Sequence, residues 1–371
     1  MGRFFDLVNK PVHELATFIA GMPTAARSRS DDHSPLIKLN ANESPYGPSP
    51  KAVAATRAAL EHSHLYPDDL SAALRQKLAD LHDVREEQIL VANGSTSLLG
   101  VIARTLLGPG RNAVTSACSF ISYPMVTRAA GATLIETPLR NNGYDLDAMR
   151  TTVNPDTRVV FIANPNNPTG TVIDADTIDR FLGSLPEQVI VVLDEAYSDY
   201  AQYFAAKRSI RYSRSLDYVR ADRNVIVLRT FSKAHGLAGV RVGYGIGPAE
   251  LIAYFTRMQD TFAVSSLAQV AALAALDDEA HVRRAVENNA QQATWMMTEI
   301  SKLGYDAPET WANFVFLDVK QDAREFARRL RGEGVLVRPL GAWGAPQAIR
   351  VTIGTAEQNQ FFLRALQTVS S

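Results

Sequence analysis

Apolar residues are arranged along the chain in two alternating ways, as short continuous runs and as segments spaced at helical intervals. Runs at Val159–Ala163, Val189–Leu193 and Val225–Arg229 alternate with helical segments such as Ser95–Leu107. Continuous apolar runs are typical of strands buried on both faces, because helices cover both sides of a parallel sheet. This order predicts an α/β fold, a mostly parallel sheet sandwiched by helices, with ligand sites at the carboxyl ends of its strands.

Further elements follow the same two patterns. Three shorter apolar runs predict strands, and three segments with apolar residues at helical spacing predict helices. The strands are expected at Ile89–Val91, Ala113–Ser116 and Thr133–Glu136, and the helices at Lys51–His62, Leu70–Leu81 and Tyr123–Ala130.

Beyond about residue 255 the alternation loosens into a different order of elements. The expected elements are a helical region at Ser266–Leu303 with a break near Asp277–Asp278, strands at Phe314–Asp318 and Ile349–Ile353, and a helix at Ala323–Gly332. A chain of 371 residues is also too long for one small core. We therefore expect a large ligand-binding α/β domain over 46–255, and a small α+β domain over 1–45, with an N-terminal arm, and 256–371.

Composition and charge exclude some classes of partner. With 46% hydrophobic and 21% charged residues, the composition is that of an ordinary globular protein. Its formal net charge of −1 gives no overall electrostatic field that would attract nucleic acid or an anionic membrane, so a small-molecule ligand is expected. The single cysteine, Cys118, cannot form an internal disulfide, which fits a reducing compartment. No apolar run reaches the roughly 20 residues of a membrane-spanning helix, and the N-terminus lacks a signal-peptide pattern. We expect a cytoplasmic protein.

Three of the buried strands end in polar segments that carry candidate chemistry. The first ends in NPNNPTG (Asn164–Gly170), where prolines and a glycine hold an asparagine at the sheet edge, although a plain turn uses the same residues. The second ends in DEAY (Asp194–Tyr197), which places a carboxylate where loss of water demands a cationic partner, although acidic residues also cap helices. The third ends in TFSKAHGLAGVRVG (Thr230–Gly243), where hydroxyls, a lysine and an arginine surround a glycine-rich turn suited to a phosphate.

Lys233, in the third segment, has two interpretations. Partly desolvated and flanked by cationic groups, it would lose basicity and become a nucleophile for a carbonyl. Most lysines, however, are solvated surface residues. The occurrence of three such segments in order on successive strand ends favours the chemical interpretation.

Together these motifs resemble those of the fold-type I aminotransferases, which depend on pyridoxal 5′-phosphate (PLP). The resemblance covers nearly the whole chain, from LNANESPYGPSP (Leu39–Pro50) to IRVTIGT (Ile349–Thr355). Within that superfamily the chain looks most similar to the histidinol-phosphate aminotransferase branch, through LNANESPYGPSP, LYPD (Leu65–Asp68) and GVLVRPLGAWGAPQAIRVTIGT. The resemblance implies transfer of an amino group from histidinol phosphate to 2-oxoglutarate, giving imidazole-acetol phosphate and glutamate in histidine biosynthesis.

The resemblance also implies roles for individual residues of a PLP site. Lys233 would form the Schiff base with PLP and act as acid and base, while Asp194 would pair with the pyridinium nitrogen. Asn167 and Tyr197 would hydrogen-bond the 3′-oxygen, and Tyr197 is counted with Lys233 and Asp194 as catalytic. The phosphate would be held by backbone amides at a helix start and by neighbouring side chains, from Gly94, Ser95, Thr96, Thr230, Ser232 and Arg241.

Other residues would complete the site. Phe120 would stack on the cofactor ring, although ordinary core packing explains it equally well. Tyr66 would reach the phosphate bound by the neighbouring subunit, which implies a homodimer with shared sites. Arg338 and Arg350 would bind the anionic end of the substrate, because a guanidinium chelates carboxylate and phosphate alike. Asn42 would lie near the substrate amine.

Two segments depart from the pattern of this branch. Thr96-Ser97 stands where an acidic pair is frequent. Because threonine and serine supply hydrogen-bond donors, PLP binding is expected to survive this change. Phe262–Ser266 (FAVSS) stands where asparagines are frequent, near the expected substrate side, which leaves the amino donor open. The alternatives are an aromatic or specialised biosynthetic aminotransferase, and a PLP decarboxylase on the same fold.

Other classes of function fit the sequence less well. A regulator built on a PLP cradle would carry an N-terminal DNA-binding domain, and only about 35 residues precede LNANES. An NAD-dependent Rossmann enzyme would need a G-x-G-x-x-G motif between an early strand and a helix, which the sequence lacks. His62, His64 and His82 match no common metal-ligand spacing, so no metal site is predicted.

Overall fold

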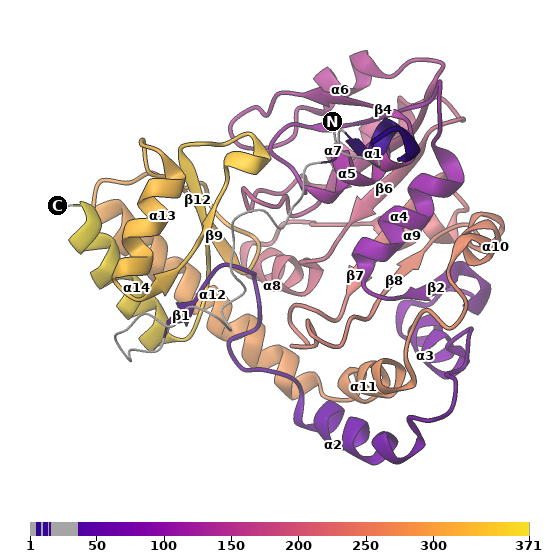
Figure 1. The fold of residues 1–371 in the computed structure, drawn as a ribbon, viewed down its shortest axis with the longest axis horizontal. Helices are drawn as coiled ribbons and strands as arrows, with labels where there is room; N and C mark the ends of the chain where they lie inside the picture. Colours follow the sequence, from indigo (N-terminus) through magenta and orange to yellow (C-terminus); the bar gives the residue numbers. More distant parts are fainter. Residues whose placement is uncertain (1–4, 9, 14, 16–35, 371) are drawn as a thin grey trace.

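A large body built on a twisted sheet packs beside a smaller body in the computed structural model (Figure 1), which describes residues 5–8, 10–13, 15 and 36–370. The smaller body, coloured orange to yellow, contains the C-terminus. Most of the predicted N-terminal arm, including residues 16–35, lies outside the described residues.

The large sheet has seven strands in the order β2-β8-β7-β6-β5-β3-β4. Its strands are β2 (Ile89–Ala92), β3 (Asn112–Ser116), β4 (Thr133–Thr137), β5 (Thr157–Ala163), β6 (Ile190–Asp194), β7 (Val225–Thr230) and β8 (Gly243–Ile246). β3 to β7 pair in parallel, and β8 runs antiparallel to both β2 and β7. The predicted mostly parallel sheet is confirmed, as is each of its predicted strands. The sequence analysis missed β8, because GYGI is short and half glycine and so gives no apolar run.

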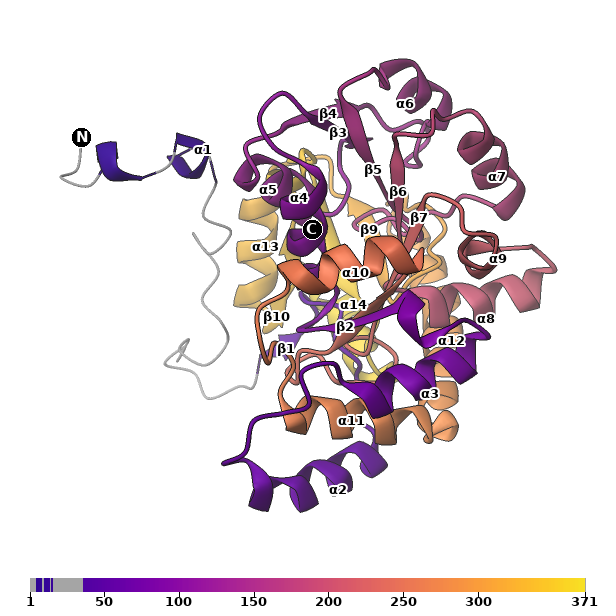
Figure 2. The ribbon, with the colours of Figure 1, turned by 90° about the vertical axis from the view of Figure 1, so that its right-hand side faces the viewer.

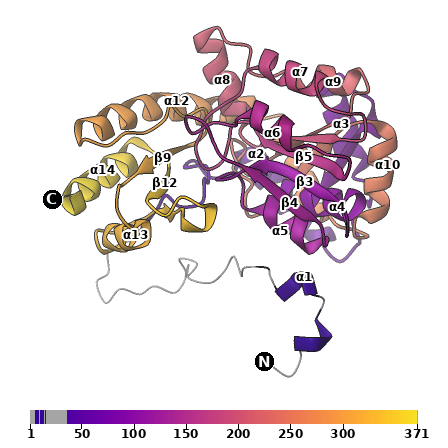
Figure 3. The ribbon, with the colours of Figure 1, turned by 90° about the horizontal axis from the view of Figure 1, so that it is seen from above.

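Helices cover both faces of this sheet (Figure 3). Alternate residues of β5 point to opposite sides, so that Val160 and Ile162 join one buried cluster while Val159 and Phe161 join another. The second cluster includes α4 (Ser95–Leu106), α5 (Ser122–Ala129) and α10 (Ala249–Met258); the first includes α3 (Ala72–His82), α6 (Leu146–Thr152), α7 (Ala175–Gly183) and α9 (Ser215–Arg220). Within the described residues, no helix is long and apolar enough to cross a membrane.

The smaller body is built from segments far apart in the sequence. Its three-stranded antiparallel sheet has the order β11-β12-β9, with β9 at Phe314–Asp318, β11 at Arg338–Pro339 and β12 at Ala348–Thr352. Helices α12 (Glu279–Lys302), α13 (Ala323–Gly332) and α14 (Ala356–Ser370) pack against this sheet. β1 (Ile37–Lys38) pairs in parallel with β10 (Val335–Leu336), which ties the first described strand to the C-terminal region.

The predicted break near residue 277 is confirmed, and it separates two helices that pack in different places. α11 (Ser266–Leu276) ends there, and α12 begins at Glu279. α11 lies against α2 (Pro50–Ala59), as Figure 2 shows, and its buried alanines belong to the core of the large body. This packing favours a domain boundary after α11 over the predicted one at residue 255, and the domain division itself stays a prediction.

A close backbone contact fixes the loop that follows β7, and substitution of Gly236 tests it. Gly236 has φ +72°, and a Cβ atom there would collide with the backbone of Gly47. We expect Gly236→Ala to lower the midpoint of thermal unfolding by about 5 °C, because the chain must shift and the residue is strained at positive φ. Gly239→Ala is the matched control, since no atom lies within 4 Å of its added Cβ and its φ is not positive. Equal midpoints for the two variants would contradict this account.

Candidate active site

A cavity of about 290 Å³ lies between the two bodies, where the carboxyl ends of β5, β6 and β7 meet the small sheet. All the predicted site residues line it except Gly94 and Tyr66. The predicted residues along its wall are Asn42, Ser95, Thr96, Phe120, Asn167, Asp194, Tyr197, Thr230, Ser232, Lys233, Arg241, Arg338 and Arg350. Residues that are far apart in the sequence therefore share one small space, as expected for polar segments at the ends of neighbouring parallel strands.

The loop after β5 is fixed by its own asparagine side chains. Asn164 forms hydrogen bonds with both backbone groups of Ile173, at 2.9 and 3.0 Å. The Asn166 amide donates to Cys118 O at 3.2 Å and to Thr169 Oγ1 at 2.9 Å. These bonds hold Asn167 at the cavity, where it is almost completely buried.

Asp194, the last residue of β6, is a buried carboxylate that few donors reach. Its side chain accepts hydrogen bonds from Tyr123 Oη at 3.1 Å and from the backbone N–H of Ala196 at 3.3 Å. Burial raises the pKa of Asp194 to about 6, although these bonds and the charge of Lys233 act in the opposite direction. Near neutral pH the carboxylate is therefore mostly ionised and has the chemistry to bind a cationic partner.

Lys233 follows β7 and is buried among charges of both signs. Burial lowers its pKa to about 8, and the charges of Arg350 and Arg241 lower it further, while Glu43 and Asp194 act against them. The amine lies 5.6 Å from the centre of the Tyr197 ring. Lys233 thus has a much larger fraction of neutral, nucleophilic amine near physiological pH than a solvated lysine.

Tyr197 is the centre of a hydrogen-bond network that joins the two bodies. Its hydroxyl oxygen accepts from Asn42 Nδ2 at 2.9 Å and from Asn167 Nδ2 at 3.3 Å. Arg350 donates to Asn167 Oδ1, and Thr352 Oγ1 donates to Asn42 Oδ1 at 3.3 Å, which fixes the orientation of both amides. Because the tyrosine oxygen already accepts two bonds, its own proton is left to donate into the cavity.

Donor groups gather where the start of α4 faces the loop before β8. Gly94 is the N-cap of α4 and has no side-chain cap, and the Arg241 guanidinium lies so close that a Cβ on Gly94 would collide with it. Arg241 Nη1 approaches Ser232 Oγ at 3.4 Å, and Ser232 also accepts from Thr230 Oγ1 at 3.0 Å. Arginine, hydroxyl and helix N-terminus together suit a phosphate group.

Arg338 and Arg350 lie side by side because β11 and β12 pair directly at these two residues. Both donate to the carbonyl oxygen of Asn40, at 3.3 and 3.2 Å. Arg350 is only 5% exposed, and burial lowers its pKa to about 10. Among the described residues its buried Nε has no hydrogen-bond partner, so this guanidinium retains a donor for an anionic ligand.

Phe120 lies on the wall of the cavity and packs edge-on against Tyr123, with 5.7 Å between ring centroids. Tyr123 in turn stacks on Phe161 in the core at 4.8 Å. The sequence analysis missed Tyr123 as a partner of Asp194, and it also missed Glu43, which lines the cavity. The helical pattern around Tyr123 suggested only a core residue, whereas the acidic Glu43 within NANES was a signal that could have been used.

Tyr66 does not reach the cavity of its own chain. Its side chain is 81% exposed and stacks on Phe262, with ring centroids 4.5 Å apart. The backbone of Phe262 also donates to Asp69, so the Leu65–Asp68 element and the segment Phe262–Ser266 pack together on the surface. Within one chain, therefore, neither Tyr66 nor the segment Phe262–Ser266 lines the cavity around Lys233.

Comparisons with known proteins give a consistent result. The family model for aminotransferase class I and II matches residues 34–366. A histidinol-phosphate aminotransferase of Moorella thermoacetica is 42% identical over 95% of this chain and 90% of its own length, and histidinol-phosphate aminotransferase 2 of Pseudomonas fluorescens is 41% identical over 99% and 98%. The crystal structure of histidinol-phosphate aminotransferase from Sinorhizobium meliloti in complex with pyridoxal-5′-phosphate aligns with a TM-score of 0.88 at 27% identity, over 99% of this chain and 98% of that one.

The lowered pKa of Lys233 gives a test that needs no substrate. In protein freed of any bound cofactor, we expect modification of Lys233 by an amine-reactive reagent to be half-maximal near pH 8, since only the neutral amine reacts. Arg350→Gln should move this midpoint to higher pH, because it removes a charge that lowers the pKa. Asp194→Asn should move it to lower pH, because that carboxylate raises the pKa. Mass spectrometry of the Lys233 peptide gives the midpoint; a midpoint that neither variant shifts would refute this electrostatic description.

Proposed function

This chain belongs to the class I and II aminotransferases, and from that membership we propose that it transfers an amino group from histidinol phosphate to 2-oxoglutarate. Aminotransferases of this family use PLP to exchange an amino group between an amino donor and a 2-oxo acid, and the chain is therefore a PLP-dependent aminotransferase. The choice of histidinol phosphate rests on relatives of that name that are about two-fifths identical over nearly the full length of the chain.

The residues of the cavity fit PLP. The close approach of Arg241 to Gly94, beside Ser95 and Ser232, leaves donors on three sides for a phosphate. The buried carboxylate of Asp194 has the charge needed by a protonated ring nitrogen. When bound, PLP supplies an aldehyde carbon and a ring that withdraws electrons from the substrate's α-carbon.

The roles of the protein side chains follow from their surroundings. Asp194 would hold its carboxylate against the ring nitrogen, and its low exposure keeps that interaction away from water. Tyr197 would donate its free proton to the ring oxygen, with Asn167 beside it. Lys233, with a pKa near 8, would both accept a proton at Nζ from the substrate carbon and return it.

The two arginines would allow one site to accept two different substrates. Glutamate and 2-oxoglutarate carry carboxylates, whereas histidinol phosphate has no carboxylate and would present its phosphate. Arg350 retains a buried donor, and Arg338 lies opposite it on the next strand. A guanidinium binds either anion in the same bidentate geometry.

We further propose a homodimer in which Tyr66 of each chain contributes to the site of its partner. Support comes from the exposure of Tyr66 in a single chain and from its exposed apolar neighbours, Leu60, Leu65, Leu70 and Phe262. An apolar surface of this kind is typical of an interface between subunits. The proposal places the enzyme in the cytoplasm, in keeping with its single cysteine.

Loss of Lys233 tests the catalytic assignment and the donor together. We expect the wild type to form glutamate from 2-oxoglutarate when histidinol phosphate is supplied, and Lys233→Ala to lose at least about 10³-fold in kcat, because the group that moves the proton is removed. Coupled detection of glutamate measures both. Glutamate formation with an aromatic amino acid but not with histidinol phosphate would favour the aromatic alternative. Release of carbon dioxide without glutamate would favour a decarboxylase.

Mixed dimers test the shared site. Lys233→Ala and Tyr66→Ala should each be impaired alone, but a heterodimer of the two has one intact site and one site with both defects. Random mixing should therefore restore roughly a quarter of the wild-type activity, as expected for a two-fold symmetric dimer. Activity of the mixture no higher than the mean of the separate variants would refute the contribution of Tyr66 to the partner's site.

A further inference from the structure

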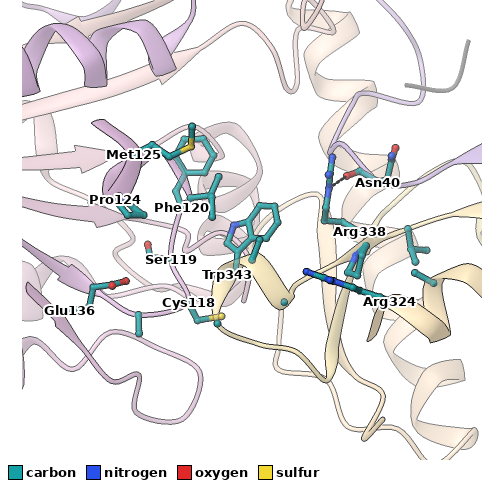
Figure 4. A pocket seen from close by; sticks show the side chains of 18 of the residues that line it. Asn40, Cys118, Ser119, Phe120, Pro124, Met125, Glu136, Arg324, Arg338 and Trp343 are labelled. Atoms are coloured by element: carbon teal, nitrogen blue, oxygen red, sulfur yellow. Dashed lines mark hydrogen bonds between the residues drawn. The ribbon is translucent and has the colours of Figure 1, made fainter. Parts of the chain in front are cut away.

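A second, larger cavity adjoins the catalytic one. Its volume is about 940 Å³, and it shares Phe120, Arg338 and Trp343 with the cavity around Lys233. Figure 4 shows these three side chains between the large body and the small body, with the cavity opening beside them. A substrate that leaves the inner cavity on this side passes through the outer one.

One face of α13 lines the outer cavity and carries a row of arginines. Arg324, Ala327, Arg328 and Arg331 recur at the spacing of one helix face, and all four line the wall. The Arg324 side chain points into the cavity in Figure 4. Its Nε lies 3.9 Å from the position of a Cβ on Gly341, so it runs along the turn η5 (Gly341–Trp343) that forms part of both cavities.

Arginines outnumber acidic residues among the described residues that line this cavity. Among the described residues that line it, Glu136 is the only acidic one, against Arg128, Arg324, Arg328, Arg331 and Arg338. Arg328 is held by Glu325 through bonds of 2.5 and 2.8 Å. Within the described part of the chain, Arg324 and Arg331 make no ion pair. Guanidinium groups that line a cavity without counter-ions concentrate small anions there.

We propose that Arg324, with Arg331 two turns further along α13, forms a second anion-binding site that takes the phosphate of the substrate as it enters. The inner arginines are already fixed to the backbone of Asn40, whereas no acceptor for the side chains of the outer pair is found among the residues that the structure describes. About 10 Å of helix separates Arg324 from Arg331, so the site extends along the face of α13 that lines the outer cavity. The outer site raises the local concentration of phosphorylated substrate and favours it over a neutral amine.

Phosphate binding to the holoenzyme tests this site without reference to the reaction. Isothermal titration of the wild type with inorganic phosphate should show two classes of site, and Arg324→Gln with Arg331→Gln should remove one of them. Arg364→Gln is the matched control, because Arg364 is exposed on α14 of the same body and lines neither cavity. A single class of site in the wild type, or two classes in the double variant, would overturn the proposal.

Kinetics then identify which anion uses the site, and this part rests on the proposed function. Arg324→Gln should raise the KM for histidinol phosphate about tenfold, with kcat almost unchanged, because the contact acts on binding and not on the reacting atoms. A rise in the KM for 2-oxoglutarate as well would show that carboxylates also use the site, and an unchanged KM for both substrates would refute it. If the wild type does not turn over histidinol phosphate at all, the proposed function fails while the phosphate titration still decides this inference.

Discussion

The guanidinium of Arg350 is the group on which the arrangement of the active site depends. It extends from the small sheet, donates to Asn167 at the end of β5, and also bonds to the backbone of Asn40. Through Asn167 it fixes the amide that donates to Tyr197, which in turn lies beside Lys233. Burial of a charge is costly unless hydrogen bonds compensate for the lost water, so these bonds from Arg350 favour the arrangement of the two bodies that forms the cavity.

The same burial sets the chemistry of the neighbouring groups. Loss of water alone would neutralise both Asp194 and Lys233, raising one pKa and lowering the other. Their mutual attraction opposes this effect, and Tyr123 adds a hydrogen bond to the carboxylate. The result is a carboxylate that is mostly charged and an amine that is close to half neutral near pH 8. One cavity thereby holds an anionic anchor and a nucleophile only because its two walls exclude water together.

Arginines suited to anion recognition lie both inside the cleft and at its mouth. Arg241 faces the start of α4, Arg338 and Arg350 face each other across β11 and β12, and Arg324 faces the outer cavity. Protein acceptors fix Arg338 and Arg350, whereas none is found for the Arg324 side chain in the described part of the chain. This difference between the inner and the outer arginines suits a substrate whose anionic group is first captured from water and then held rigidly.

What the sequence determined by itself was the large sheet and the position of the chemistry on it. Buried strands require continuous apolar runs, and the polar segments containing Asn167, Asp194 and Lys233 follow such runs directly, so their place at one sheet edge was predictable. The residue types also indicated the cofactor, since the order of the three motifs resembles that of a known family. The arginines of the small body were identified only through that resemblance.

Only the tertiary structure decided which distant segments meet. The backbone of Asn42 bonds to Thr352, 310 positions away, β1 pairs with β10, and α11 packs with the large body. Tyr123 meets Asp194, and the arginine face of α13 turns towards the cleft. Periodicity shows which face of an element is apolar but not which partner covers it, because that choice depends on the packing of the whole chain.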